Sequence, residues 1–374
     1  MASSAFEQAD AAAIDLVFEG GEGYTYGRYH NPTVAALEHA VADLEGAEAT
    51  LAYGSGMAAI AAAFRALELG DGAKIICARD LYGATIYWLE REAQRLGWEI
   101  VYVDFVARPF NAQAVRAEEP SAVYCETLSN PLVRLVDLDS LGSACGDAGV
   151  PLVVDATFTP PCCLRPIEHG TTLVVHSATK YLGGHGDVIA GVLSGSGELI
   201  EVAKAQRSLD GTIVDPFTAW LVLRGLKTLP LRFQRQCANA ARIAAHLNTH
   251  HSVDQVHYPG VGRRDAEPEI ATLERLYPHG DYGAMLSFEI AGALHDEPAR
   301  FLDALQLWGT ATTLGDLESL ALIPAMTSHR KLPEERRTNM GIVPGLVRLS
   351  VGIEDADDLI ADLDRALAEV VEGR

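Results

Sequence analysis

The first half of the chain alternates short apolar runs, rich in valine and isoleucine, with longer segments whose apolar residues recur at helical spacing. Short apolar runs bounded by turn residues are typical of buried strands, and their alternation with helices favours an α/β layer on a parallel sheet. We therefore predict strands at 74–77, 100–103, 122–125, 152–154 and 173–175. A further strand at 188–193 completes a large, mostly parallel sheet.

The second half of the chain has a different pattern. An apolar helix is predicted around 220–229, followed by a helix rich in alanine, arginine and histidine. Strands are predicted at 285–290 and 346–351, and an amphipathic helix at 356–370 lies close to the end of the chain. This order of elements predicts a smaller α+β unit after the large α/β one.

The beginning of the chain fits neither unit. Its first residues show little periodicity and end in the Gly- and Tyr-rich stretch 20–29, which predicts an extended arm. A helix is predicted next, because Asn31 and Pro32 form a capping signal and Gly46 a stop. A chain of 374 residues also exceeds the roughly 250–300 residues at which a single core stops growing. We predict an arm at 1–30, a large domain at 31–222 and a C-terminal domain at 223–374.

Composition and charge narrow the class of protein. Lys and Arg total 29 against 51 Asp and Glu, a formal net charge of -22 that would repel a polyanion, so we expect no nucleic-acid partner. A small anion remains compatible, because backbone amides and a few cations suffice to form its pocket. No apolar run approaches the ~20 residues that cross a bilayer, and no basic-then-apolar leader is visible. We therefore expect no membrane partner and a cytoplasmic location.

Two residue types invite a metal or disulfide interpretation that the spacing does not favour. The six cysteines are scattered without C-x-x-C pairs, which predicts reduced thiols. His246 and His250 lie one helical turn apart, but no third ligand is near in the sequence. We interpret them as a solvated helix face and expect no metal site.

The segment 176–185 contains a lysine, Lys180, flanked by the hydroxyls of Ser177 and Thr179 and followed by two glycines. It comes directly after the predicted strand 173–175. A lysine in this setting suits a Schiff-base amine beside an anion, because the hydroxyls can donate to a phosphate. Taken alone, the segment also fits a surface lysine in a turn.

A carboxylate stands at the end of the preceding predicted strand. The run 152–154 leads directly into Asp155. Ligands of open α/β sheets bind at the carboxyl ends of the strands, where an acid could pair with the protonated pyridine nitrogen of pyridoxal 5'-phosphate (PLP). Asp155 alone could equally cap a loop or helix.

A glycine turn precedes an alanine-rich helical segment. Gly54 and Gly56 flank Ser55, and Met57 leads into the predicted helix 58–67. The free amides at a helix start suit a phosphate, although a purely structural helix start would look similar. The sequence is not a Walker loop, because no Gly-Lys-Ser/Thr follows.

Together these motifs resemble the PLP enzymes of cysteine and methionine metabolism, the family of cystathionine gamma-synthase, cystathionine gamma- and beta-lyase and methionine gamma-lyase. The resemblance extends from about Tyr24 to Leu363. Its blocks, in order, are Tyr26-x-Arg28, Asn31-Pro32-Thr33, Ser55-Gly56-Met57-Ala58, Leu81-Tyr82-Gly83, Ser129-Asn130-Pro131, Val154-Asp155-x-Thr157-Phe158, Ser177-x-Thr179-Lys180, 223–229 and 348–354. It implies the PLP-dependent transferase fold, aspartate aminotransferase-like or fold type I.

The resemblance also implies roles for the matching residues. Lys180 would bind PLP and shuttle protons, Asp155 would pair with the pyridine nitrogen, and Tyr82 would stack on the ring. The phosphate would be held by Gly56, Met57, Ser177 and Thr179, and by Tyr26 and Arg28 of a neighbouring subunit. The carboxylate of an amino-acid substrate would be held by Arg348 with Asn130 and Thr313. A homodimer or homotetramer, a dimer of dimers with shared active sites, is implied.

The reaction type is less closely determined than the family. Methionine gamma-lyases place a cysteine where this chain has Ala84, and enzymes that handle cystathionine often place a glutamate where it has Thr312. Because Thr312 cannot pair with a distal ammonium, we predict a carbon-sulfur lyase acting by beta or gamma elimination, typical of methionine or cystathionine gamma-lyases. The alternatives are a gamma-replacement enzyme that uses an activated homoserine ester and, less favoured, an aminotransferase.

Overall fold

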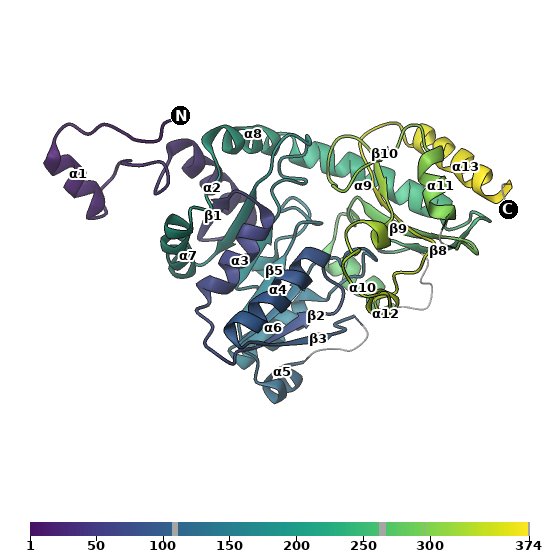
Figure 1. The fold of residues 1–374 in the computed structure, drawn as a ribbon, viewed down its shortest axis with the longest axis horizontal. Helices are drawn as coiled ribbons and strands as arrows, with labels where there is room; N and C mark the ends of the chain where they lie inside the picture. Colours follow the sequence, from purple (N-terminus) through teal and green to yellow (C-terminus); the bar gives the residue numbers. More distant parts are fainter. Residues whose placement is uncertain (107–110, 262–266, 295, 373–374) are drawn as a thin grey trace.

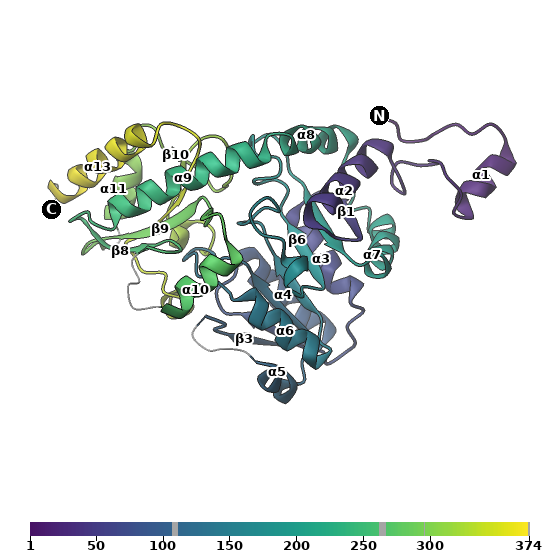
Figure 2. The ribbon, with the colours of Figure 1, turned by 180° about the vertical axis from the view of Figure 1, so that it is seen from behind.

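The protein is described from a computed structural model, which describes residues 1–106, 111–261, 267–294 and 296–372. Two sheets lie side by side, each covered by helices (Figure 1). The N-terminal arm extends from the large-sheet side, away from the rest of the molecule, while the C-terminal helix lies at the opposite end; the view from behind shows the same arrangement (Figure 2).

The large sheet has seven strands in the order β1-β7-β6-β5-β4-β2-β3. Their bounds are Ala49–Tyr53 (β1), Lys74–Ala78 (β2), Glu99–Val103 (β3), Ala122–Glu126 (β4), Leu152–Asp155 (β5), Leu173–His176 (β6) and Gly191–Gly195 (β7). The strands from β2 to β6 pair in parallel, and β7 is antiparallel to both β6 and β1. The five predicted parallel strands are confirmed; the sixth begins at Gly191 rather than at 188, and β1 was not predicted.

Helices cover this sheet and connect its strands. Their bounds are Pro32–Glu45 (α2), Gly56–Ala66 (α3), Gly83–Leu96 (α4), Ala112–Glu118 (α5), Leu138–Ala148 (α6), Gly197–Asp210 (α7) and Pro216–Leu226 (α8), with a 3-10 turn at Pro166–His169. The predicted start of α2 is confirmed, since the Asn31 side chain accepts from the Thr33 N–H at 2.9 Å. Its end is confirmed too, because Gly46 adopts a left-handed φ of 69°, which glycine tolerates best.

The small sheet has five strands in the order β10-β11-β12-β9-β8, antiparallel except for the pair β10 and β11. Its strands are Val253–His257 (β8), Met285–Ile290 (β9), Gly309–Thr310 (β10), Leu320–Leu322 (β11) and Leu346–Ser350 (β12). The helices are Leu229–Leu247 (α9), Glu267–Leu276 (α10), Glu297–Ala304 (α11), Glu334–Asn339 (α12) and Ala356–Glu372 (α13), with a 3-10 turn (η2) at Pro324–Met326. The two helices predicted here are confirmed as α8 and α9, but the apolar one ends at Leu226 rather than at 229, and Pro230, which lacks an N–H, lies in the first turn of α9.

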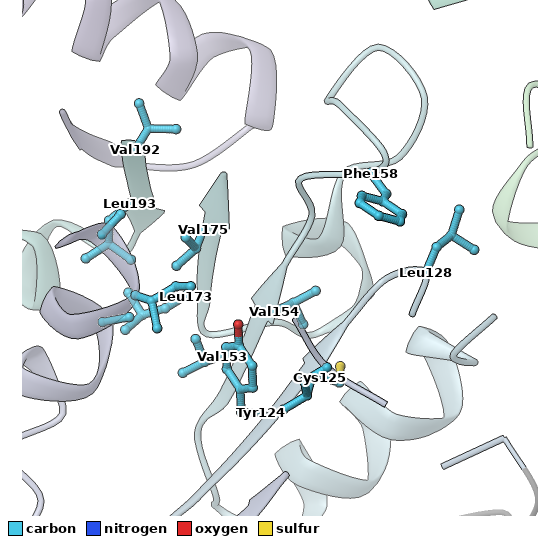
Figure 3. Close-up of a cluster of buried hydrophobic side chains, with 14 of the residues drawn as sticks. Tyr124, Cys125, Leu128, Val153, Val154, Phe158, Leu173, Val175, Val192 and Leu193 are labelled. Carbon is cyan, nitrogen blue, oxygen red and sulfur yellow. The ribbon is translucent and has the colours of Figure 1, made fainter. Parts of the chain in front are cut away.

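The buried apolar residues form two clusters. The first fills the space around the large sheet; Figure 3 shows Val153, Val154, Leu173 and Val175 from its central strands packed side by side. The second lies between the small sheet and the helices α9 and α13. Two clusters accord with two domains, and we propose 1–30, 31–222 and 223–374 as the arm, the large domain and the small domain.

The arm is not wholly extended as predicted, because Ala11–Phe18 forms a helix, α1. Asp10 caps it by accepting from the Ala13 N–H at 2.9 Å, and the alanines that open it have the highest helix propensity. None of its residues is buried, and Leu16 and Phe18 are 59% and 65% exposed. Across the described residues, no helix combines the length and apolarity needed to cross a membrane.

Candidate active site

The carboxyl ends of three neighbouring parallel strands meet at one edge of the large sheet. Glu126 at the end of β4 lies in register with Asp155 at the end of β5, and Asp155 lies in register with Val175 of β6. The chain leaves β6 at His176 and turns directly into Ser177 and the residues around Lys180. A cavity of about 720 Å³ opens over this edge, and Lys180, Asp155 and Glu126 all line it.

Lys180 carries an amine with an unusual protonation equilibrium. Its Nζ donates a hydrogen bond to Oγ1 of Thr313 at 2.7 Å. Burial, together with the positive charge of Arg348, lowers its pKa to about 8, and the Asp316 carboxylate opposes this shift. The neutral form, which attacks a carbonyl, is therefore a minority near physiological pH, but it is far more populated than for an ordinary lysine.

Two buried carboxyl groups lie beside each other below the cavity. Asp155 is 9% exposed and accepts from the Thr157 N–H at 2.9 Å; burial raises its pKa. Burial and the Asp155 charge raise the pKa of Glu126 well above its usual range. Glu126 accepts from the Tyr82 N–H at 2.6 Å and so holds the start of α4. Sequence analysis did not single out Glu126, although it ends a buried strand just as Asp155 does.

An anion-binding corner lies at the start of α3. Ser55 caps this helix by accepting from the Ala58 N–H at 3.1 Å, and the N–H groups of Gly56 and Met57 belong to its first turn, where helical partners are lacking. Ser177 lies directly against this turn and also lines the cavity. Thr179 lines it too, but its hydroxyl exchanges hydrogen bonds with the backbone of Ala190, at 3.0 and 3.2 Å.

The small sheet contributes a guanidinium to the opposite wall. Arg348, on β12, is 3% exposed and donates to Asn130 Oδ1 at 3.1 Å and to the Thr313 carbonyl at 3.3 Å. Its Nε is buried and has no hydrogen-bond partner among the described residues. Burial lowers its pKa to about 10. A buried cation with an unused donor is suited to an anionic ligand such as a carboxylate.

The structure brings most, but not all, of the predicted site residues together. Tyr82 lines the cavity and is 39% exposed. Tyr26 and Arg28 lie on the arm instead, where Arg28 donates to the Ser208 carbonyl and lies 4.7 Å from the centre of the Tyr29 ring. Neither is among the described residues that line the cavity. Thr313 lies next to Arg348 as expected, but its hydroxyl contacts Lys180, a contact that sequence analysis missed.

An amine, a buried carboxyl group and a helix start at one sheet edge are the parts that an α/β-class PLP enzyme needs for its Schiff base, its pyridine nitrogen and its phosphate. The sequence profile described as "Cys/Met metabolism PLP-dependent enzyme" matches residues 1–368, and the chain belongs to this family. Its cofactor is accordingly PLP.

The similarity to known proteins extends over nearly the whole chain. A cystathionine gamma-lyase from Bacillus subtilis (strain 168) is 40% identical over 93% of this chain and 89% of its own. An L-methionine gamma-lyase from Pseudomonas putida is 40% identical over 92% and 85%. The crystal structure of a cystathionine gamma synthase from Xanthomonas oryzae pv. oryzae, in complex with aminoacrylate and cysteine, superposes with a TM-score of 0.92 at 34% identity, covering 100% and 93%. The fold of this chain is therefore PLP fold type I.

Proposed function

We propose that the protein is a carbon-sulfur lyase that cleaves sulfur amino acids by beta or gamma elimination. Family membership supports PLP chemistry on such amino acids, while the names of the relatives divide between elimination and replacement. The observation that carries the choice is the charge of the cavity wall. The acidic side chains among its described lining residues are Glu126 and Asp155, both at the base.

Among the described residues that line the cavity, none above Glu126 and Asp155 offers a carboxylate to the distal ammonium of a substrate. The position where an acid would be needed is Thr312, which lines the cavity. Asp303 lines a separate neighbouring cavity of about 280 Å³. Because an unpaired ammonium in a partly desolvated pocket is costly, binding a small or neutral leaving group is easier than binding a second amino acid.

Residues next to both sheets take part in the proposed elimination. PLP, when bound, withdraws electrons from the α-carbon of the substrate. We propose that Arg348 and Asn130 hold the substrate carboxylate and that Tyr82 takes a proton from its amino group. Lys180 Nζ then removes the proton from the α-carbon, for which an amine with a pKa of about 8 is well matched to neutral pH.

A product panel tests this function. Methionine, homocysteine and cystathionine are incubated separately without a keto acceptor, and thiol, ammonia and 2-oxo acid are measured. Elimination yields ammonia, 2-oxo acid and the sulfur product in equal amounts, the last being a thiol from methionine or cystathionine and hydrogen sulfide from homocysteine, whereas an aminotransferase yields no ammonia and no sulfur product. A parallel reaction offers an activated homoserine ester with cysteine; if cystathionine formation is much the fastest reaction, the enzyme catalyses gamma replacement and the lyase proposal is wrong.

A further inference from the structure

The rim of the active-site cavity is positively charged although the whole chain is strongly acidic. The formal net charge is -22, yet Arg330 and Lys331 line the cavity and are both exposed. The lining acids Glu126 and Asp155 end buried strands of the large sheet at the base, not at the rim. In the described part of the chain, no ion pair with a carboxylate is found for either rim cation.

The segment that carries these two residues is fixed to the body of the protein. His329, immediately before them, is fully buried, and its Nε2 lies 3.2 Å from the carbonyl oxygen of Leu81. Leu332, immediately after them, is 6% exposed. The Arg330 N–H donates to the Thr327 carbonyl at 3.2 Å. Buried neighbours on both sides therefore hold the backbone of the two cations at the rim.

Lys331 also has a defined position on the cavity wall. Its Nζ lies 5.0 Å from the centre of the Tyr87 ring, a cation-π contact. Tyr87 lines the same cavity and belongs to α4, the helix that begins next to Tyr82. This contact leaves the charge of the ammonium unneutralised, because an aromatic ring carries no net charge.

We propose that Arg330 and Lys331 recognise a second acidic group at the far end of the substrate side chain. The preferred substrates would then be thioether amino acids whose leaving thiol carries a carboxylate or sulfonate. This inference rests on the lyase activity proposed above and adds a substrate class to it. The cavity, at about 720 Å³, lies in the upper part of the range of about 300–1,000 Å³ for small-molecule sites, so it has room for such a group beside PLP.

Charge explains the direction of the preference. With the substrate carboxylate at Arg348, a leaving group that extends toward the rim approaches two cations. A leaving group with an acidic distal end is attracted to them and one with a basic distal end is repelled, while a neutral end experiences neither force. The effect should appear in KM more than in kcat, because the distal charge is bound alike in the ground state and in the transition state.

The test compares three thioethers that differ at the distal end, each prepared from cysteine and from homocysteine. The S-carboxymethyl, S-ethyl and S-(2-aminoethyl) derivatives provide negative, neutral and positive ends. Elimination consumes one water and releases the thiol, ammonia and pyruvate or 2-oxobutanoate. We expect kcat/KM to fall in the order carboxymethyl, ethyl, aminoethyl, by roughly tenfold at each step for partly enclosed charges.

Variants assign the preference to the rim. In the double variant Arg330→Met/Lys331→Met, the kcat/KM values of the three thioethers should differ by no more than about threefold. In Lys331→Glu, the aminoethyl compound should become the preferred substrate. Arg165→Met is the matched control, because it removes one exposed positive charge outside the cavity lining and should keep the wild-type order. Visible absorbance of bound PLP and circular dichroism show that each variant is folded.

The two proposals fail in different ways. If none of the thioethers yields a 2-oxo acid, the lyase function is wrong. If the S-ethyl compounds are cleaved but the three ends react equally, the charge inference is wrong. A preference that persists in the double variant, or that Arg165→Met abolishes, would also overturn it.

Discussion

At the residue scale, the site depends on two neighbouring acids that cannot both ionise cheaply. Glu126 and Asp155 end adjacent strands in register, and burial raises the pKa of each. The charge of Asp155 raises the pKa of Glu126 further. A proton held on Glu126 would leave Asp155 as the single charge available to the pyridine nitrogen of PLP, the role that we propose for it.

This pairing makes stability depend on pH. Because the pKa of Glu126 is raised by folding, its contribution to stability is fully present below the unfolded value of about 4.3 and is lost as pH rises toward the folded value. The Gln side chain of Glu126→Gln cannot ionise, so the variant avoids this loss. The melting temperature of the variant minus that of wild type should therefore be larger at pH 8 than at pH 5. Glu99→Gln, on an exposed side chain, is the control. If the difference in melting temperature is the same at both pH values, the pKa of Glu126 is not raised by folding.

Lys180 gives a second pH-dependent prediction. Enzyme stripped of PLP should recapture it at a rate that rises with pH and levels off above about 8, because only the neutral amine attacks the aldehyde. The rate is followed by visible absorbance and by the mass of the borohydride-reduced protein. Lys180→Ala should show no covalent PLP at any pH, while Lys204→Ala, a half-buried residue of α7 outside the cavity lining, should behave as wild type. Capture by Lys180→Ala would assign the amine elsewhere.

At the scale of elements, the anion-binding corner at the start of α3 depends on how closely α3 approaches the end of β6. A Cβ on Gly56 would lie 2.8 Å from the Cβ of Ser177 and 3.0 Å from its Oγ, so any side chain there pushes the two elements apart. No bound ligand is needed for this clash. Its cost is that of overpacking, typically about 1–3 kcal/mol.

Gly56→Ala should therefore weaken PLP retention and lower the free energy of unfolding by about 1–3 kcal/mol. Dialysis against PLP-free buffer followed by absorbance, and denaturant unfolding, measure the two effects. Gly70→Ala is the matched control, because a Cβ at Gly70 would meet no atom within 4 Å. Retention equal to that of the control would show that the corner does not hold the phosphate.

The sequence predicted those elements that are marked by residues within them, and it missed features that depend on residues far apart in the chain. The strands 74–77 and 173–175 and the cap at Asn31 are marked by residues inside them, and all are confirmed. Strand β1 was missed because its alanines suit a helix, and only pairing with the distant β7 makes it a strand. The contact between Lys180 and Thr313 joins residues 133 positions apart and has no local signal at all.

At the scale of the whole molecule, the arm holds two predicted PLP ligands away from the cavity of its own chain. Figure 1 shows the arm extending from the body, and Tyr26 is 42% exposed. The proposed roles of Tyr26 and Arg28 therefore require the cavity of a second subunit. We propose a homodimer, or a tetramer built from such dimers, in which the sites are shared.

Subunit mixing tests this arrangement. Arg28→Ala and Lys180→Ala should each have little activity, but a mixed dimer contains one site that has both an intact lysine and an intact neighbouring arginine. Random mixing should therefore restore up to about a quarter of wild-type activity, from half of the dimers with one good site each. Mixed dimers are verified by mass spectrometry. Without any recovery in verified mixtures, Arg28 would serve its own subunit.

Helix α9 belongs to both hydrophobic clusters. Leu229 and Phe233, in its first turns, pack with the large sheet, whereas Ile243 and Leu247 pack with the small one. One continuous helix thus links the two domains and sets the spacing between Lys180, which follows β6 of the large sheet, and Arg348 on β12 of the small one. The two side chains are preorganised: the entropy cost of setting their separation is met once, when the chain folds, and not again at every turnover.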